Sequence, residues 1–397
     1  MNVVLITLDT LRADHLSCYG YQRQTSPNLD RFAAKGVRFK NAFCTIPCTL
    51  PSHASIMTGL HPYSLSLGNN NTHLTTEVST LAEVLKAQGY TTAAFVSSFV
   101  LAPETNISQG FGVYDATNDF VVEVLDRSSN VYPGRRHALQ TTRRAVEWLR
   151  NHTTATQQPF FLWVHYYDPH FPYVPPPEFD RFGTFAQSGT CDLYRRLESK
   201  EISMSDVFSI ESGVVSDKEI ERGIDLYDAA ILSMDYSLGI LLDALHGSLS
   251  NTIFLIVGDH GESLGEHGPV FCHFLLDDPC VRVPLIVVSE GRLPQGQERD
   301  DLCSTLDILP TLLSLLRVGQ SSLPDSVERS GRDLFAEPII PPRAVFADDG
   351  VKLFMVRTLF SKTLLTEDGN VMTFFDLVAS PDEGRFSDPM QSSHDEE

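Results

Sequence analysis

The chain has 397 residues, of which 42% are hydrophobic, and a formal net charge of −21 at pH 7. A chain of this length can bury a large core, either as one α/β domain with an appendage or as roughly two to three domains. The negative charge argues against a nucleic-acid backbone or an anionic membrane surface as the main partner. It does not exclude a small anionic substrate, because a bound metal ion can invert the local field.

Cysteine usage and hydropathy indicate the compartment. The seven cysteines form an odd number without a CxxC pair, which indicates buried thiols rather than a disulfide framework or a thiolate zinc site. No apolar run approaches the length needed to span a bilayer. The sequence opens on an apolar run at residues 3–6, without the basic region or cleavage site of a signal peptide. We therefore expect a cytoplasmic protein without a membrane span.

Short apolar runs typical of buried strands alternate along the chain with helical patterns. In chain order, the predicted strands are residues 2–8, 91–97, 160–165, 252–257 and 284–288. Helical patterns cover residues 26–36, 80–89, 224–245 and 306–316, and Thr80 and Glu83 form a capping box at the start of the second. This alternation predicts an α/β fold with a large, mostly parallel sheet sandwiched by helices.

The predicted domain boundaries lie where the alternation of strand and helix patterns weakens. Residues 1–342 form the predicted main α/β domain, and the Pro-rich stretch 172–218 is an insertion and a candidate lid. Residues 343–380 carry short alternating runs that predict a small antiparallel C-terminal subdomain, although the first run, 344–347, also fits the main sheet. The polar residues 381–397 are predicted to be a disordered tail.

The segment 48–59 carries a candidate nucleophile. Thr49 occupies a helix N-cap position, Pro51 lies in the first turn, and Gly59 can end the helix. Free backbone N–H groups and a partial positive charge attract oxyanions to a helix N-terminus. A hydroxyl or thiol here would face a bound phosphate or sulfate, although the segment alone also fits an ordinary capped helix.

Three predicted strands end in acidic or histidine residues. They are followed by Asp9, by the segment 165–168 that ends in Asp168, and by Asp259-His260. Ligands of open α/β sheets bind beyond the carboxyl ends of the strands, so these side chains could converge on one metal ion. Each alone also fits a turn or helix cap. A mixed oxygen and nitrogen site suits Zn, Mn or Mg, and a threonine hydroxyl needs such an ion to become a good nucleophile.

These motifs together resemble the sulfatase family of the alkaline phosphatase superfamily. The similarity runs in order through residues 6–16, 51–59, 165–173, 257–268 and 282–285, and ends at 356–358 and 375–377. The resemblance implies the alkaline phosphatase-like α/β fold and at least one divalent metal ion (Mn, Zn, Mg or Ca). It implies a small anionic ester as substrate. It also implies that Asp9, Asp259 and His260 bind the metal with Thr49 as the nucleophile touching it, and Asp168 is a further candidate ligand.

The resemblance also suggests roles for five other residues. His170 matches a histidine near the leaving group, and His273 falls where many members place a lysine that holds the transferred group. Asn70 matches an asparagine that contacts its oxygens, His53 replaces the arginine that supports the nucleophile, and Arg12 is a candidate anion contact. Simpler interpretations stay open: a core histidine for His273, a turn for Asn70 and a surface charge for Arg12.

The chain departs from the family pattern at the nucleophile. A usual sulfatase carries Cys-x-Pro-Ser-Arg, and its cysteine is oxidised to formylglycine. Alignment on the Pro-Ser pair places Thr49 at the cysteine position, with Cys48 one residue early and His53 at the arginine. Thr10 replaces a second aspartate, and His260 replaces an asparagine. With these residues, the chain resembles superfamily members that use threonine to cleave phosphate esters.

The prediction is therefore a metal-dependent hydrolase of phosphate mono- or diesters, with sulfate esters also accepted. A sulfatase proper, a phospho-head-group transferase and a non-catalytic binding module are the alternatives. The alcohol part of the substrate and the oligomeric state stay open.

Overall fold

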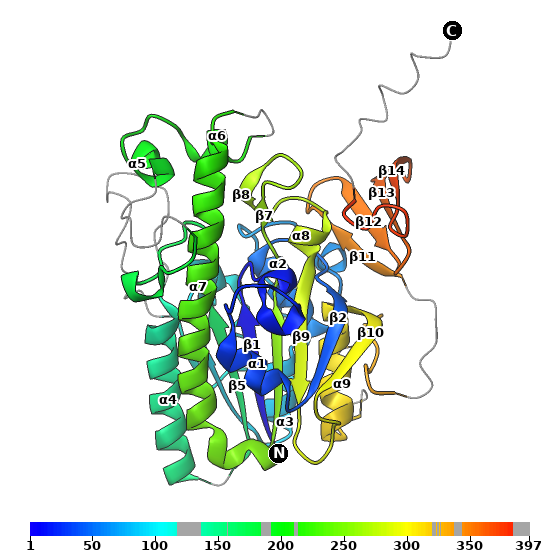
Figure 1. Ribbon diagram of the computed structural model, residues 1–397. Helices are drawn as coiled ribbons and strands as arrows, with labels where there is room; N and C mark the ends of the chain where they lie inside the picture. The colour runs from blue at the N-terminus through cyan, green and yellow to red at the C-terminus, as the bar shows by residue number, and fades with distance from the viewer. Residues whose placement is uncertain are drawn as a thin grey trace.

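The computed structural model describes residues 1–116, 136–156, 158–183, 192–209, 213–319, 323, 325, 327–336 and 344–383. Its centre is an eight-stranded sheet in the order β10-β2-β9-β6-β1-β5-β3-β4 (Figure 1). The strands are β1 (Asn2–Leu8), β2 (Val37–Phe43), β3 (Thr91–Phe95), β4 (Val113–Asp115), β5 (Phe160–Tyr166), β6 (Thr252–Gly258), β9 (Arg282–Val288) and β10 (Gln297–Ser304). All neighbouring pairs are parallel except those of β9 with β2 and β6. The mostly parallel sheet is confirmed, whereas β2, β4 and β10 were not predicted.

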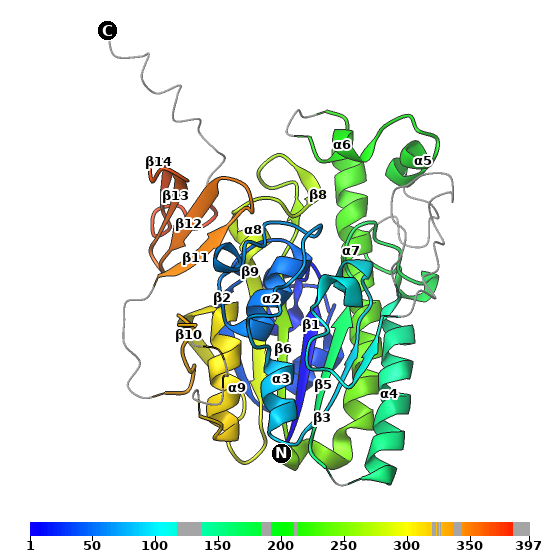
Figure 2. The ribbon, with the colours of Figure 1, turned by 180° about the vertical axis from the view of Figure 1, so that it is seen from behind.

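Helices cover both faces of this sheet. Helices α1 (Pro27–Ala33), α4 (Ala138–Ala155) and α7 (Asp217–Ala244) lie on the face seen in Figure 1. Helices α2 (Thr49–Thr58), α3 (Leu81–Ala87) and α9 (Ile308–Leu316) lie on the face seen in Figure 2. Strand β1 contributes side chains to the hydrophobic cores on both faces of the sheet. Val3 and Leu5 belong to one core, and Val4 and Ile6 belong to the other.

Shorter elements lie above the C-terminal edge of the sheet. They are α5 (Asp192–Glu198) and α6 (Met204–Val207) in the predicted insertion, then β7 (Ser263–Leu264), β8 (Val270–Cys272) and α8 (Asp278–Val281). Parts of the predicted insertion, residues 184–191 and 210–212, lie outside the described residues. Among the described helices, none combines the length and apolar character needed to cross a membrane.

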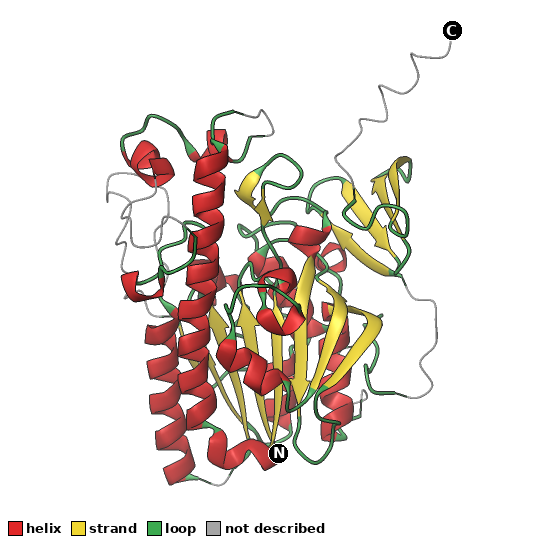
Figure 3. Cartoon of the chain, in the orientation of Figure 1, coloured by secondary structure: helices red, strands yellow, loops and turns green. Residues whose placement is uncertain are grey.

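The C-terminal subdomain is a separate antiparallel sheet, visible in Figure 3 beside the main one. It contains β11 (Val345–Asp348), β12 (Leu353–Arg357), β13 (Ser361–Thr366) and β14 (Val371–Asp376). The run at 344–347 therefore belongs here rather than in the main sheet. The first residues of the predicted tail are also packed, because the buried Glu383 accepts hydrogen bonds from Lys362 at 2.8 Å; residues 384–397 lie outside the described part.

Candidate active site

Three adjacent parallel strands, β6, β1 and β5, bring the central side chains together. Asp9 follows β1, His165 lies near the end of β5, and Asp259 and His260 follow β6. Nε2 of His260 lies 3.7 Å from Oδ1 of Asp9 and 3.6 Å from Oδ2 of Asp259. The ligand atoms of these three residues all lie within 4.8 Å of one another. The predicted convergence of strand ends on one site is therefore present in the structure.

The electrostatics of this cluster suit a divalent cation. Burial raises the pKa of Asp9, and burial together with the nearby Asp9 raises the pKa of Asp259. Neither oxygen of Asp9, nor Oδ2 of Asp259, makes an ordinary hydrogen bond within the described residues. Burying unpartnered carboxylates is costly unless a cation compensates them. The donor set fits Mn, Zn or Mg.

The tautomer of His260 gives its inner nitrogen a lone pair that can bind an ion. Nδ1–H donates to the carbonyl of Gly261 at 3.0 Å, so Nε2 carries a lone pair that points toward the carboxylates. Burial lowers the pKa of His260 to about 3, which keeps the ring neutral. A neutral imidazole held at its other nitrogen is the usual form of a metal-binding histidine.

Thr49 is the first residue of α2, not its N-cap. Cys48 has the extended backbone of an N-cap (φ −153°, ψ 131°), and its carbonyl accepts from the N–H of Ser52 at 3.0 Å. The predicted cap was therefore placed one residue late. Oγ1 of Thr49 lies 3.4 Å from Nε2 of His260, so the hydroxyl faces the cluster. The predicted end at Gly59 is confirmed by its left-handed backbone, with φ 69°.

His53 holds the first turn of α2 through a chain of buried hydrogen bonds. Its Nδ1–H donates to the carbonyl of Thr49 at 2.7 Å, so its Nε2 accepts from the hydroxyl of Thr7 at 2.9 Å. The Thr7 oxygen in turn accepts from Nε1–H of Trp163 at 2.9 Å. Burial lowers the pKa of His53, so a neutral ring stands where the family resemblance places an arginine.

The other predicted substrate contacts surround Thr49 and His260. Oδ1 of Asn70 accepts from the N–H of Leu50 at 2.8 Å, which ties it to the α2 N-terminus. The ring of His273 lies 4.6 Å from that of His260 and 5.1 Å from that of His170. Nδ1–H of His170 donates to the carbonyl of Phe171 at 2.5 Å and lies 3.1 Å from the hydroxyl of Tyr167, so the other ring nitrogen, Nε2, carries the lone pair of the neutral ring. The structure thus brings His170, His273 and Asn70 to one site.

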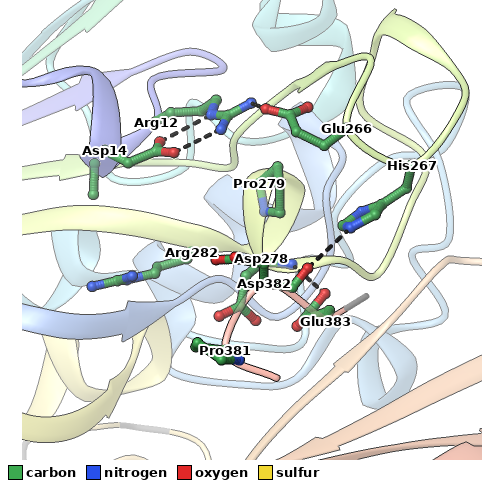
Figure 4. A pocket seen from close by; sticks show the side chains of 11 residues that line it. Arg12, Asp14, Glu266, His267, Asp278, Pro279, Arg282, Pro381, Asp382 and Glu383 are labelled. Atoms are coloured by element: carbon green, nitrogen blue, oxygen red, sulfur yellow. Dashed lines mark hydrogen bonds and ion pairs between the residues drawn. The ribbon is translucent and has the colours of Figure 1, made fainter. Parts of the chain in front are cut away.

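Arg12 is directed elsewhere. Its guanidinium donates to Asp14 at 2.7 and 2.9 Å, to Glu266 at 2.5 Å and to the carbonyl of Glu262 at 3.1 Å. Figure 4 shows it pointing toward these carboxylates at the wall of a cavity of about 550 Å³. Only 3% of Arg12 is exposed, so the interpretation of Arg12 as a surface charge is wrong. Its donors are occupied by the chain itself, and a contact with substrate is not supported.

Asp168 is placed beside the cluster rather than in it. Its Oδ2 accepts from the N–H of Ala138, the first residue of α4, at 2.9 Å. Its Oδ1 lies 3.7 Å from Nδ1 of His137. The described residues include two groups that could hold a metal ion, Asp9 with Asp259 and His260, and Asp259 with His53 and His165, and neither contains Asp168. The structure therefore supports the alternative in which Asp168 caps backbone, here at the start of α4.

Two further buried residues lie at the site: His165, which belongs to a strand end predicted to converge on a metal ion, and Glu262, which was not predicted. Nδ1 of His165 accepts from the N–H of Ser97 at 3.2 Å, so Nε2–H points toward Oδ2 of Asp9, 3.4 Å away. The position of His165 near the end of a predicted strand is the feature of the sequence that places it at the site. Glu262 accepts from the hydroxyl of Tyr173 at 2.6 Å, and burial raises its pKa to about 8. No spacing in the sequence marks Glu262, because a loop brings it there.

The fold and the site together define a mostly parallel α/β protein with a buried carboxylate–histidine cluster at the ends of its parallel strands. A family model described as Sulfatase matches residues 1–318. The chain therefore belongs to the sulfatase family and is an ester hydrolase of the alkaline phosphatase superfamily, as predicted. It is 30% identical over 352 residues to a sulfatase of Formosa agariphila (79% of this chain and 69% of that protein). It is 26% identical over 393 residues to an arylsulfatase of Clostridium perfringens (85% and 78%).

Solved structures share the fold. A structure in complex with its substrate D-glucosamine-2-N,6-O-disulfate has a TM-score of 0.74 at 20% identity, and the match covers 97% of this chain and 92% of that chain. The phosphonate monoester hydrolase of Agrobacterium radiobacter has a TM-score of 0.72 at 20% identity, with 96% and 90% covered. Proteins with this fold thus include one described with a sulfated sugar as its substrate and one named as a phosphonate monoester hydrolase.

Proposed function

We propose that the protein hydrolyses phosphate mono- or diesters, and accepts sulfate esters, with Oγ1 of Thr49 as the nucleophile. The observation that carries this proposal is the position of that hydroxyl, 3.4 Å from Nε2 of His260 at the start of α2. The neighbouring Cys48 is a poor candidate, because burial raises the pKa of its thiol to about 12. A protonated thiol is neither a good nucleophile nor a good metal ligand.

Asp9, Asp259 and His260 would hold the divalent metal ion, and Thr49 is near enough to contact it. When bound, the ion would neutralise the ester oxygens and lower the pKa of the Thr49 hydroxyl. Two neighbouring groups surround these ligands. Nε2 of His165 lies 3.4 Å from Oδ2 of Asp9, and the carbonyl of Gly261 fixes the tautomer of His260.

The reaction then follows from the chain's own groups. Thr49 gives its proton to solvent, and its Oγ1 then bonds to phosphorus while the bond from phosphorus to the alcohol oxygen breaks. His170 donates a proton from Nε2 to the departing alcohol, which requires the protonated ring. A water molecule then attacks phosphorus and gives one proton back to Nε2 of His170, while the bond from phosphorus to Oγ1 of Thr49 breaks and Thr49 recovers its proton from solvent. The hydrogen bond from His53 to the Thr49 carbonyl orients the nucleophile throughout.

A sulfatase proper is the second candidate. The similarity to an arylsulfatase and to a sulfatase favours it. The residue at the nucleophile position argues for phosphate instead, because threonine cannot be oxidised to formylglycine by the route that cysteine takes.

The test is a parallel assay of an aryl sulfate, an aryl phosphate and a bis-aryl phosphate, with Mn, Zn, Mg or Ca added in turn. Thr49→Ala should reduce kcat by about a thousandfold or more, because the nucleophile is lost. Cys48→Ala is the matched control one residue away and should keep activity. Loss of activity in Cys48→Ala but not in Thr49→Ala would overturn the proposed nucleophile. Cleavage of the aryl sulfate alone would overturn the phosphate preference.

A further inference from the structure

Glu262 joins two segments that carry groups of the proposed reaction. It lies in the loop after β6, two residues beyond His260, and it is fully buried. Its Oε2 accepts from the hydroxyl of Tyr173 at 2.6 Å. Tyr173 lies beyond the end of β5, three residues after His170. This hydrogen bond therefore connects the segment that contains His260 with the segment that contains His170.

The backbone of the loop after β6 gives the side chain of Glu262 a fixed base. The N–H of Gly261 donates to the carbonyl of Cys280 at 2.7 Å. A Cβ on Gly261 would lie 2.0 Å from the carbonyl oxygen of Pro279, so the two backbones are in close contact. The carbonyl of Glu262 itself accepts from the guanidinium of Arg12 at 3.1 Å. The loop is thus held on both sides of the Glu262 side chain.

At the other end of the hydrogen bond, the position of Tyr173 affects His170. Tyr173 is buried, and its N–H donates to the hydroxyl of Tyr194 at 2.7 Å. Its ring packs edge-on against the ring of Phe171, with ring centres 5.3 Å apart. The carbonyl of Phe171 accepts from Nδ1–H of His170 at 2.5 Å. A displacement of Tyr173 would therefore move Phe171 and, with it, the carbonyl that orients the ring of His170.

Packing alone does not explain a carboxylate at this buried position. An apolar side chain would fill the same space at lower cost, because a carboxylate loses its hydration when it is buried. Glu262 is also absent from both groups of described residues that could hold a metal ion. Its short hydrogen bond with a phenol is strong and directional. The contact with Tyr173 is therefore the role that the described residues give to this carboxylate.

We propose that Glu262 is a positioning residue: through Tyr173 it holds His170 where Nε2 can protonate the departing alcohol. The inference rests on the proposed function for the role of His170, but the orientation of that ring can be measured without turnover. The alternative is a hydrogen bond that only stabilises the fold, and its loss would then affect all substrates alike.

The kinetic test compares two esters whose alcohols differ in their need for a proton. 4-Nitrophenolate can depart without help, whereas benzyl alcohol must be protonated as it leaves. Tyr173→Phe removes one hydroxyl and should reduce kcat/KM by about tenfold or more for benzyl phosphate, but by about threefold at most for 4-nitrophenyl phosphate. Glu262→Ala should have the same selective effect. Glu262→Gln keeps an oxygen that can accept from Tyr173, so it should preserve the wild-type ratio of the two values.

Tyr21→Phe is the matched control. The hydroxyl of Tyr21 donates to the carboxylate of Asp228 at 2.7 Å, so the same kind of hydrogen bond is lost elsewhere in the chain. Asp228 keeps Arg23 and His15 as partners, and the ratio of the two kcat/KM values should stay that of the wild-type protein. An equal loss for both esters in Tyr173→Phe would overturn the proposal. So would a Glu262→Gln variant that matches Glu262→Ala in this ratio.

Nuclear magnetic resonance of the full-length protein, labelled with nitrogen-15 in histidine, tests the position of His170 without substrate. At a pH of about 9 the ring is neutral, and the signals missing from His170→Gln identify it. The wild-type ring should show a protonated Nδ1 and an unprotonated Nε2 with widely separated shifts, because Nδ1–H is bound to the Phe171 carbonyl. In Tyr173→Phe the two shifts should approach each other as the ring exchanges between tautomers.

Unchanged shifts of His170 in Tyr173→Phe would overturn the proposal whatever the kinetics show. The same pair of alcohols is also assayed as sulfate esters, so that the ratio can be measured on either class. If no ester of either class is cleaved, the proposed function fails, and the resonance measurement still decides whether the contact between Glu262 and Tyr173 positions His170.

Discussion

Replacing Thr7 by valine should expose how much the buried hydrogen bonds behind Thr49 contribute to stability. The hydroxyl of Thr7 accepts from Nε1–H of Trp163 and donates to Nε2 of His53, both at 2.9 Å. Valine has a similar shape but can do neither, so two fully buried polar groups lose their partner at once. Each such group costs roughly 1–3 kcal/mol, and partial relaxation leaves an expected loss of about 3 kcal/mol.

The assay is urea unfolding followed by circular dichroism, with the free energy obtained by linear extrapolation. The matched control is Thr305→Val: Thr305 is 1% exposed, and its hydroxyl has no hydrogen-bond partner among the described residues. Removing that hydroxyl relieves a desolvated group, so the control should be neutral or stabilising by up to about 1 kcal/mol. Equal losses in the two variants would refute the reasoning. A normal kcat in Thr7→Val would separately refute the role given to His53 in orienting Thr49.

Without metal, Asp9→Asn should melt at a higher temperature than the wild-type protein, because burial disfavours the charge of Asp9 and this charge also raises the pKa of Asp259. Calorimetry of chelated samples checks this, and a lower melting temperature contradicts it. Burial raises the pKa of Asp235 from 3.8 to about 6, so the folded protein holds its proton longer than the unfolded chain. The stability of the wild-type protein relative to Asp235→Asn should therefore fall by about 3 kcal/mol as the pH rises from about 3 to about 7; a pH-independent difference in urea titrations contradicts this. Gly59→Ala should cost roughly 1 kcal/mol because its φ is 69°, whereas Gly247→Ala, at a position with open space and no left-handed φ, should be near neutral in the same titrations.

The strands that were predicted are those with continuous apolar sequences, because such a run indicates a buried strand. Strands β1, β5 and β6 are buried along their whole length and consist mostly of apolar residues, so hydropathy finds them. Strand β10, with the sequence QERDDLCS, is mostly exposed in its first half and lies at the sheet edge. The extended conformation of β10 depends on its pairing with β2, which is distant in the chain. The local sequence pattern of β10 therefore does not predict it.

The residues of the site also divide into those that the sequence predicts and those that it does not. Residues that directly follow buried strands, such as Asp9 and Asp259, could be predicted because the end of a parallel strand fixes their place. Thr49 was predicted as the nucleophile but given the wrong cap position, since Cys48 supplies the N-cap backbone without any side-chain bond. Glu262 and the actual partners of Arg12 depend on how the loop after β6 folds back, and no spacing in the sequence encodes that path.

The charge balance of the site links the acidic chain to its anionic substrate. Burial lowers the pKa of His53, His260 and His273, so none of these rings supplies positive charge near neutral pH. Arg12 is close in sequence to Asp9, but carboxylates of the chain already neutralise it. A protein with a net charge of −21 would repel a phosphate or sulfate ester unless positive charge were added locally. The carboxylate oxygens of Asp9 and Oδ2 of Asp259, which have no hydrogen-bond partner among the described residues, are where a bound divalent ion would add that charge, beside the hydroxyl of Thr49.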